Sequence, residues 1–166
     1  EAQRERQSPR QFVQGESFPF LGEMIRLRLV EGAEYLRRDN GEFLLGADLV
    51  PRAPALFRTW YRARAREILE ERVERFARRM GVVVRGVRIT DAKQRWGSCS
   101  PAGTLNFAWR LVMAPEGIIE YVIVHELAHL IEMNHSRRFW ETVGRVLPDY
   151  AVRRAWLRKN EDRLTL

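Results

Sequence analysis

The stretch His125-Glu126-Leu127-Ala128-His129, followed by His135, decides the fold because it predicts a metal site built on a helix. Residues at i and i+4 share one face of a helix, so His125 and His129 can direct two imidazoles at one ion. Glu126 lies about 100° round the helix from His125, beside the ion rather than on it. That is where a general base must lie to take a proton from zinc-activated water.

His135 is the predicted third ligand. The chain contains only three histidines, and they all fall within the eleven residues from 125 to 135. We expect the helix to end near Met133-Asn134, with Asn134 in the left-handed conformation that brings His135 back. Three imidazoles with one open position predict a catalytic zinc site with one ion per chain. Ordinary core histidines or an inactive metal-binding relic are the alternatives, and the absence of histidine elsewhere disfavours the first.

Length and composition indicate one domain without internal disulfides. The chain has 166 residues and a single cysteine, which fits a reducing compartment, so we expect a cytoplasmic protein. No signal-peptide pattern is present, and the longest apolar run, Ile118 to Val124, is too short to span a bilayer. We therefore expect no membrane partner.

The net charge of +7 is unevenly distributed. Residues 58–79 and 137–163 each carry a net charge of +4. Such surfaces attract nucleic acid, phosphates or acidic substrates. The alternative is a solvated helix face with Glu–Arg pairs at i,i+4, such as Glu71/Arg75 and Glu74/Arg78. We favour the solvated face, since most charge runs on helices are of this kind.

The N-terminal half predicts a small β unit followed by a long helix. Residues 1–17 are polar and predict a flexible tail. In residues 18–50, apolar and charged positions alternate, and Asn40-Gly41 is a strong hairpin-turn signal. Residues 51–80 then carry apolar side chains at helical spacing, and Gly81 supplies the stop.

The C-terminal half predicts a β hairpin region and then the metal helix. Residues 82–113 read as strands, with strict alternation from 104 to 113. Residues 115–133 are apolar nearly all round and predict the buried metal helix, and residues 136–166 predict C-terminal helices that begin at a Ser136 cap. The predicted fold over residues 18–166 is α+β and zincin-like. It has a twisted, mainly antiparallel sheet, a long backing helix and a buried HExxH helix.

With these residues in hand, the chain resembles a known family. RWGSCS (95–100), NFAWRL (106–111) and HELAH-x5-HS-x2-FW (125–140) are similar to the YgjP-like metallopeptidase domain, a family related to the SprT-like zinc proteases. The resemblance extends from about Gly15 to Leu157. It implies zinc bound by His125, His129 and His135, Glu126 as the base, and a zincin-type fold.

Two other zinc-protease patterns fit less well. The histidine spacing equals that of the metzincins, but Glu132 occupies the glycine position of their motif and no methionine follows His135. A thermolysin-like scheme would take its third ligand from a downstream glutamate. Glu141 and Glu161 are available, but His135 is the simpler donor.

Further site residues are expected in and after the RWGSCS stretch. Trp96 is expected in the core and Cys99 as a small buried residue, because no histidine remains to activate its thiol. Extended substrates often add to a sheet edge, and a cation or hydroxyl must hold the oxyanion. The candidates for lining the substrate cleft are Arg95, Ser98 and Asn106, and those for the oxyanion are Tyr150, Arg137 and Arg138.

Three functions remain open at this point. The first is a zinc-dependent endopeptidase that hydrolyses polypeptides with Glu126 as general base. The second uses the same three histidines on a nucleoside triphosphate, an activity associated with YgjP-type proteins and suited to an arginine-rich surface. The third is a DNA-associated protease recruited through basic helices, as in SprT-like relatives. The sequence shows no zinc-finger cysteines to support the third.

Overall fold

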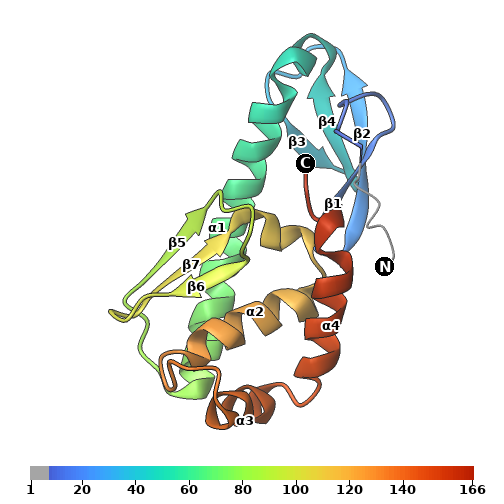
Figure 1. Cartoon of the computed structure of the whole chain (residues 1–166). Coiled ribbons are helices and arrows are strands. Elements are labelled where there is room, and N and C mark those ends of the chain that lie inside the picture. Colours follow the sequence, from blue (N-terminus) through green and yellow to red (C-terminus); the bar gives the residue numbers. More distant parts are fainter. Residues whose placement is uncertain (1–7) are drawn as a thin grey trace.

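The computed structural model describes residues 8–166 and is organised along one long helix, α1 (Ala53–Met80). Figure 1 shows α1 running the length of the molecule, with one sheet at its first half and a second sheet and three helices at its second half. The predicted α+β class with a backing helix is confirmed. The strands and remaining helices are β1 (Ser17–Phe20), β2 (Glu23–Val30), β3 (Arg37–Asp39), β4 (Glu42–Gly46), β5 (Gly86–Thr90), β6 (Gly97–Cys99), β7 (Thr104–Ala108), α2 (Glu116–Ala128), α3 (Arg137–Val146) and α4 (Tyr150–Asn160), with 3-10 helices η1 (Ala47–Arg52), η2 (Trp109–Met113) and η3 (Glu161–Arg163).

The first sheet has the strand order β1-β2-β4-β3. The β1–β2 and β3–β4 pairs are antiparallel, and β2–β4 is parallel. Asn40 and Gly41 connect β3 to β4 with φ values of 47° and 77°, the positive values that a tight hairpin turn requires. The predicted turn is therefore confirmed. The parallel pair arises because β3 lies outside β4, so β2 and β4 become neighbours with the same direction.

Helix α1 forms where the helical apolar spacing predicted it. Its buried positions, among them Tyr61, Leu69 and Val73, recur every three or four residues and lie on the side of the core. Gly81 ends the helix in the left-handed conformation, and its N–H bonds to the carbonyls of Ala77 and Arg78. The helix therefore carries both sheets on one continuous apolar stripe.

The second sheet is smaller and differs from the predicted hairpin region. Its order is β5-β7-β6, with β5–β7 parallel and β6–β7 antiparallel. Three of the five strand pairings in the two sheets are antiparallel, yet each sheet is mixed. The strand predicted over 104–113 ends at Ala108 and continues as η2, because four of the five η2 side chains are buried. A strand with one exposed face cannot bury side chains in this way.

The segment expected to be a flexible tail is packed from Arg10 onwards. Phe12 is buried and its ring lies 5.5 Å from that of Phe18 and 5.1 Å from that of Phe57. Arg10 donates hydrogen bonds to the carbonyls of Ser17 and Thr165. The apolar contact of Phe12 offsets the entropy of ordering this stretch, which the polar composition did not reveal. Residues 1–7 lie outside the described part of the chain.

Tyr61 of α1 forms a hydrogen bond to the first sheet, and replacing Tyr61 tests how much this hydrogen bond contributes to stability. Its buried hydroxyl donates a 2.6 Å hydrogen bond to the Pro19 carbonyl. Tyr61→Phe leaves that carbonyl unpaired, so we expect a loss of about 1–3 kcal/mol in the free energy of unfolding at neutral pH, measured by urea denaturation. The hydroxyl is fully enclosed, and the expected loss is therefore larger than for a surface tyrosine.

The same variant should respond differently to alkaline pH. Burial raises the pKa of Tyr61 well above its ordinary value, and the charges of Arg10 and Arg38 offset only part of this effect. Above about pH 10 the unfolded tyrosine loses its proton while the folded one keeps it, so the wild type loses stability as the pH rises. The gap between wild type and Tyr61→Phe should narrow there. A gap that stays constant between neutral pH and about pH 11 would contradict the burial of this hydroxyl.

Within residues 8–166, no helix combines the length and the apolar character needed to cross a membrane.

Candidate metal centre

Helix α2 provides the first two histidines, and it is shorter than predicted. It ends at Ala128, and His129 is the C-cap residue. Residues 129–131 form a turn in which each N–H bonds to the carbonyl three residues before it. This turn redirects the chain, so a left-handed Asn134 is not needed. In the described chain the only non-glycine residues with positive φ are Phe12, Leu21 and Asn40.

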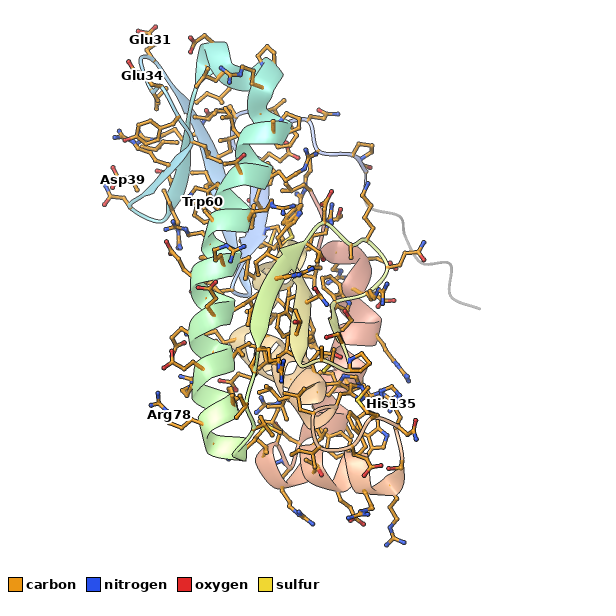
Figure 2. All side chains as sticks on the ribbon, turned by 90° about the vertical axis from the view of Figure 1, so that its left-hand side faces the viewer. Glu31, Glu34, Asp39, Trp60, Arg78 and His135 are labelled. Carbon is orange, nitrogen blue, oxygen red and sulfur yellow. The ribbon has the colours of Figure 1, made fainter. Side chains whose placement is uncertain are left out.

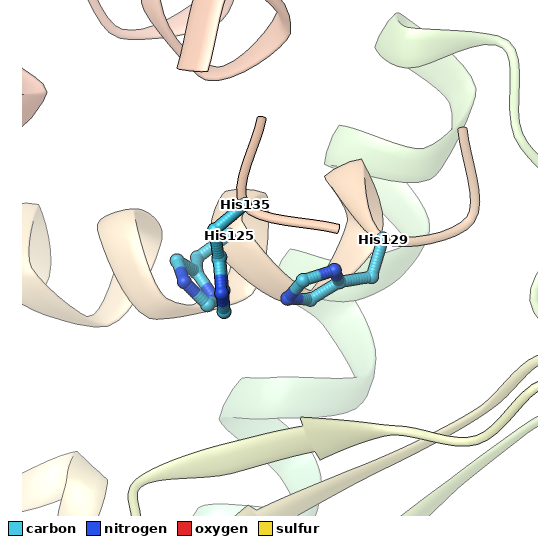
Figure 3. Close-up of side chains that lie close together, drawn as sticks. All are labelled: His125, His129 and His135. Atoms are coloured by element: carbon cyan, nitrogen blue, oxygen red, sulfur yellow. The ribbon is translucent and has the colours of Figure 1, made fainter. Parts of the chain in front are cut away.

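The turn brings the three histidines together, as the spacing predicted. Each of His125, His129 and His135 offers a ring nitrogen, and these nitrogens lie within 4.8 Å of one another. Figure 3 shows the three rings converging on one point beside α2. The ring centroids of His125 and His129 are 5.0 Å apart, and those of His129 and His135 are 4.7 Å apart. This cluster is small enough for one metal ion to bind all three nitrogens after small ring rotations.

Helix α3 holds the three rings in place. Ser136 caps the helix, as predicted, by accepting a hydrogen bond from the Phe139 N–H. The fully buried Phe139 ring then lies 5.1 Å, 4.5 Å and 4.9 Å from the rings of His125, His129 and His135. Trp140 stacks on His135 at 6.0 Å. Sequence reasoning assigned these two aromatic residues no part in the site, although they lie only three and four residues after the capping serine.

Glu126 is the one buried charged residue among residues 8–166, with 4% of its surface exposed. Its carboxylate oxygen Oε1 lies 3.3 Å from Nδ1 of His125. Strand β6 closes over its other side. A Cβ atom at Gly97 would lie only 3.0 Å from the Cγ of Glu126 and 3.2 Å from the Phe107 ring. The glycine of RWGSCS therefore permits the close approach of a strand to this glutamate.

The chemistry of this donor set suits a metal cation. The pKa of His135 is held below its ordinary value by burial and by the neighbouring His125 and His129, so its neutral, ligating form is favoured. The Nδ1 atom of His129 is buried and has no hydrogen-bond partner among the described residues. Neutral imidazole nitrogens that face one another leave lone pairs without a hydrogen-bond donor. A cation bound between the three rings would accept those lone pairs.

Two of the three predicted substrate residues, Ser98 and Asn106, lie on the face of the sheet that is opposite Glu126. Side chains alternate across a strand, and Gly97 faces Glu126, so its neighbour Ser98 faces away. Asn106 pairs with Ser98 in register, and its side-chain amide donates a 3.2 Å hydrogen bond to the serine hydroxyl. Ser98 and Asn106 therefore brace the outer face of the sheet. Arg95 lies before β6 and lines a separate cavity of about 620 Å³, and none of the three histidines lines that cavity.

The oxyanion candidates also separate in space. Arg137 and Arg138 are exposed on α3, and Arg137 pairs with Glu141 at 3.1 Å. Tyr150 instead stacks on Trp140 at 5.3 Å, in line with His135. Arg154, which sequence reasoning did not single out, lies 4.7 Å over the Trp140 ring. Tyr150 and Arg154 thus both contact Trp140, the residue that stacks on His135, and of the three oxyanion candidates Tyr150 is the one linked to the histidines in this way.

The remaining residues of the RWGSCS stretch fit a structural role. Trp96 is partly buried against the core, and its carbonyl accepts a hydrogen bond from the Ala108 N–H. Burial raises the pKa of the Cys99 thiol, and the nearby Glu126 carboxylate raises it further. A thiol of raised pKa carries little thiolate at neutral pH, which agrees with the expectation that Cys99 is no nucleophile.

A buried glutamate in an HExxH helix, beside three converging imidazoles on an α+β scaffold, defines a metal-dependent hydrolase. The family model of the YgjP-like metallopeptidase domain matches residues 1–160. The chain belongs to this family, as the sequence motifs predicted, and the family implies a catalytic metal and polypeptide substrates.

Among solved structures, the chain is similar to the metallopeptidase zymogen of Pyrococcus abyssi abylysin. The sequence identity is 30%, the match covers 48% of this chain and 80% of that chain, and the TM-score is 0.45. No curated protein matches the chain. The family assignment therefore rests on the match over residues 1–160.

Proposed function

We propose that the protein is a zinc-dependent endopeptidase. In this proposal His125, His129 and His135 bind one zinc ion, and Glu126 is the general base. The observation that carries the proposal is the convergence of three imidazoles within 4.8 Å beside a buried glutamate. Three protein ligands that leave a position open for substrate are typical of catalytic zinc, and imidazole is a donor that suits this ion.

The residues around the cluster divide the chemistry between them. Zinc, when bound, polarises the scissile carbonyl and lowers the pKa of the attacking water. Glu126 takes the proton from that water and returns it to the leaving amine. Its burial against β6 holds the carboxylate in one place, which favours proton transfer over exchange with solvent. The Tyr150 hydroxyl is the proposed donor to the oxyanion, since it lies at the end of the stack on His135.

Strand β6 offers a place for an extended substrate. It is the terminal strand of its sheet, and Trp96 and Ser100 direct their backbone groups at β7. Because these directions alternate along a strand, Gly97 and Cys99 direct their N–H and C=O groups to the open edge. A polypeptide that pairs with this edge would pass beside Glu126. Arg95, just before β6, would meet a peptide that extends beyond it, whereas Ser98 and Asn106 face away.

The alternative functions receive less support. The acidic partners of the α1 arginines include the predicted pairs Arg75–Glu71 at 4.0 Å and Arg78–Glu74 at 2.9 Å, which lowers the attraction of this face for DNA. Figure 2 shows Arg78 on the other side of the molecule from His135. No feature of the cluster distinguishes a triphosphate from a peptide. The peptidase assay therefore includes a nucleoside triphosphate as a second substrate.

Replacing His135 tests the metal site and the reaction together. We expect His135→Ala to weaken zinc binding by more than the roughly 10- to 100-fold that follows loss of an orienting partner, because a direct ligand is lost. Zinc content after dialysis, and peptides released from an unfolded protein, are measured by mass spectrometry. Asn134→Ala, a change in the same exposed loop, is the control and should match the wild type.

The outcomes of this assay separate the proposals. Peptides produced by the zinc-loaded wild type, and lost on chelation and in His135→Ala, would support the endopeptidase. Pyrophosphate or monophosphate produced instead of peptides would move the protein to nucleotide hydrolysis. Full zinc affinity in His135→Ala would rule out this histidine as the third ligand.

A further inference from the structure

One face of α4 lies against Trp140, which stacks on His135, and it carries two arginines that have no acidic partner among residues 8–166. Tyr150, Arg154 and Arg158 follow one another at intervals of four, so they lie on one side of the helix. Figure 1 shows α4 packed across one end of α2. We refer to these three residues as the α4 row.

The neighbouring arginine shows how unusual this is. Arg153 lies on another side of α4 and is fully engaged: it contacts Asp149 at 3.0 Å, the Gly117 carbonyl at 3.0 Å and Glu120 at 3.2 Å. Within residues 8–166, neither Arg154 nor Arg158 forms an ion pair or a side-chain hydrogen bond. Arg154 is nevertheless only partly exposed and is placed by its contact with Trp140. The structure thus holds a guanidinium in place without using its N–H donors.

The contact with Trp140 leaves those donors available. A guanidinium that lies over an aromatic ring interacts through its face, while its five N–H bonds point outward in the plane. The Trp140 ring lies 6.0 Å from that of His135, and the Arg154 guanidinium carbon lies 4.7 Å from the Trp140 ring. Arg154 is therefore within about 11 Å of the His135 ring, a distance that about three residues of an extended peptide span.

The charge balance favours an anion at this position. Glu126 is the buried acidic group beside the cluster, and its carboxylate lies on the side of β6 and His125. A carboxylate is the group of a polypeptide that matches the planar fork of an arginine in two parallel hydrogen bonds.

We propose that the α4 row is a subsite for a carboxylate of the polypeptide substrate, with Arg154 as its main contact. This inference rests on the proposed peptidase function and specifies its substrate class: peptides with a negative charge within about three residues of the scissile bond. The carboxylate has two possible sources, an Asp or Glu side chain or the C-terminus of a short peptide. Both present the same chemistry, and the test distinguishes them.

The test compares matched peptides and matched variants. Three internally quenched peptides are used: one with Glu at the positions flanking the cleaved bond, one with Gln at these positions, and one with Gln and a free C-terminal carboxylate three residues after the bond. The other two peptides are amidated at the C-terminus. The zinc-loaded proteins are the wild type, Arg154→Gln, Arg154→Lys and the control Arg137→Gln. The control removes the same charge from an exposed α3 position that already pairs with Glu141.

We expect the wild type and Arg137→Gln to cleave a carboxylate peptide with a kcat/KM about 10- to 100-fold above that of the neutral peptide, mainly through KM, as suits one charge-assisted contact. Arg154→Gln should lose this preference and cleave the neutral peptide as before. Arg154→Lys should restore only part of it, because lysine cannot form the bidentate pair. Preference for the Glu peptide identifies a side chain as the source, and preference for the free terminus identifies a C-terminal carboxylate.

Equal cleavage of charged and neutral peptides by the wild type would overturn the subsite, as would an undiminished preference in Arg154→Gln. Failure of the peptidase proposal is recognised separately, by the absence of any cleavage. In that case the same peptides are titrated into zinc-loaded Glu126→Gln protein and binding is followed by fluorescence anisotropy. A carboxylate preference that depends on Arg154 would uphold the subsite even without hydrolysis, and equal binding would refute it.

Discussion

Glu126→Gln is expected to lower kcat/KM for peptide hydrolysis by about 10²- to 10⁴-fold and to leave one zinc ion bound per chain. The amide has the shape of the carboxylate, so the contacts with Gly97 and His125 are preserved. It cannot accept a proton from water, and the general base is lost. Because the side chain is buried, solvent cannot easily substitute for it. Mass spectrometry measures whether zinc stays bound, and cleavage of an internally quenched peptide measures the loss in kcat/KM.

Glu132→Gln is the matched control for this experiment. Glu132 lies in the loop between His129 and His135 and undergoes the same chemical change, but it does not belong to the cluster. It should keep both zinc and activity within a few-fold of the wild type. Activity retained in Glu126→Gln would show that another group accepts the proton. Zinc lost from Glu126→Gln would instead give Glu126 a part in binding the metal.

The fold was predictable where local patterns determine it. The helical spacing and the Gly81 stop defined α1, and Asn40-Gly41 defined the β3–β4 turn. The parallel pairing of β2 with β4 is non-local and leaves no mark in either strand. The alternation of apolar and polar residues over 104–113 also predicted a strand that is too long. Alternation indicates which side chains share a face, but it does not reveal that side chains on both faces of residues 109–113 are buried. Neighbouring elements, here α1 and α2, decide that.

The histidine cluster was predictable because its residues lie close together in the sequence. His125 and His129 depend only on helix geometry, and His135 follows after one turn of chain. The cleft was less predictable. The face of β6 on which Ser98 lies could not be predicted, because a shift of one residue exchanges the two faces of a strand and the sequence alone does not fix which residues point to which face. Arg154 lies nineteen residues after His135 in the sequence, in another helix. Only the packing of α4 brings its guanidinium to Trp140, beside the histidine cluster.

Gly97→Ala is expected to lower kcat/KM by about 10- to 100-fold while zinc stays bound. The added methyl group would lie 3.0 Å from the Cγ of Glu126 and 3.2 Å from the Phe107 ring, tighter than most contacts of a Cβ atom, so a neighbour must move by a few tenths of an ångström. Phe107 is buried and cannot move freely, so Glu126 or strand β6 must shift. The backbone at Gly97 is not in the left-handed region, and alanine adds no strain of that kind. The loss therefore arises from displacement of the base, and the rate on a quenched peptide measures it.

Gly86→Ala separates this displacement from a general effect on the sheet. Gly86 lies in β5 of the same sheet, and a Cβ atom there would meet only Thr104, at 4.0 Å. It should retain both activity and stability, whereas Gly97→Ala should also lose about 1–3 kcal/mol of unfolding free energy through overpacking. Equal activity in the two variants would show that β6 does not position Glu126. A loss confined to Gly97→Ala would instead explain why a glycine precedes Ser98 in the edge strand: the strand that is free to pair with a substrate must also lie against the base that takes the proton from the attacking water.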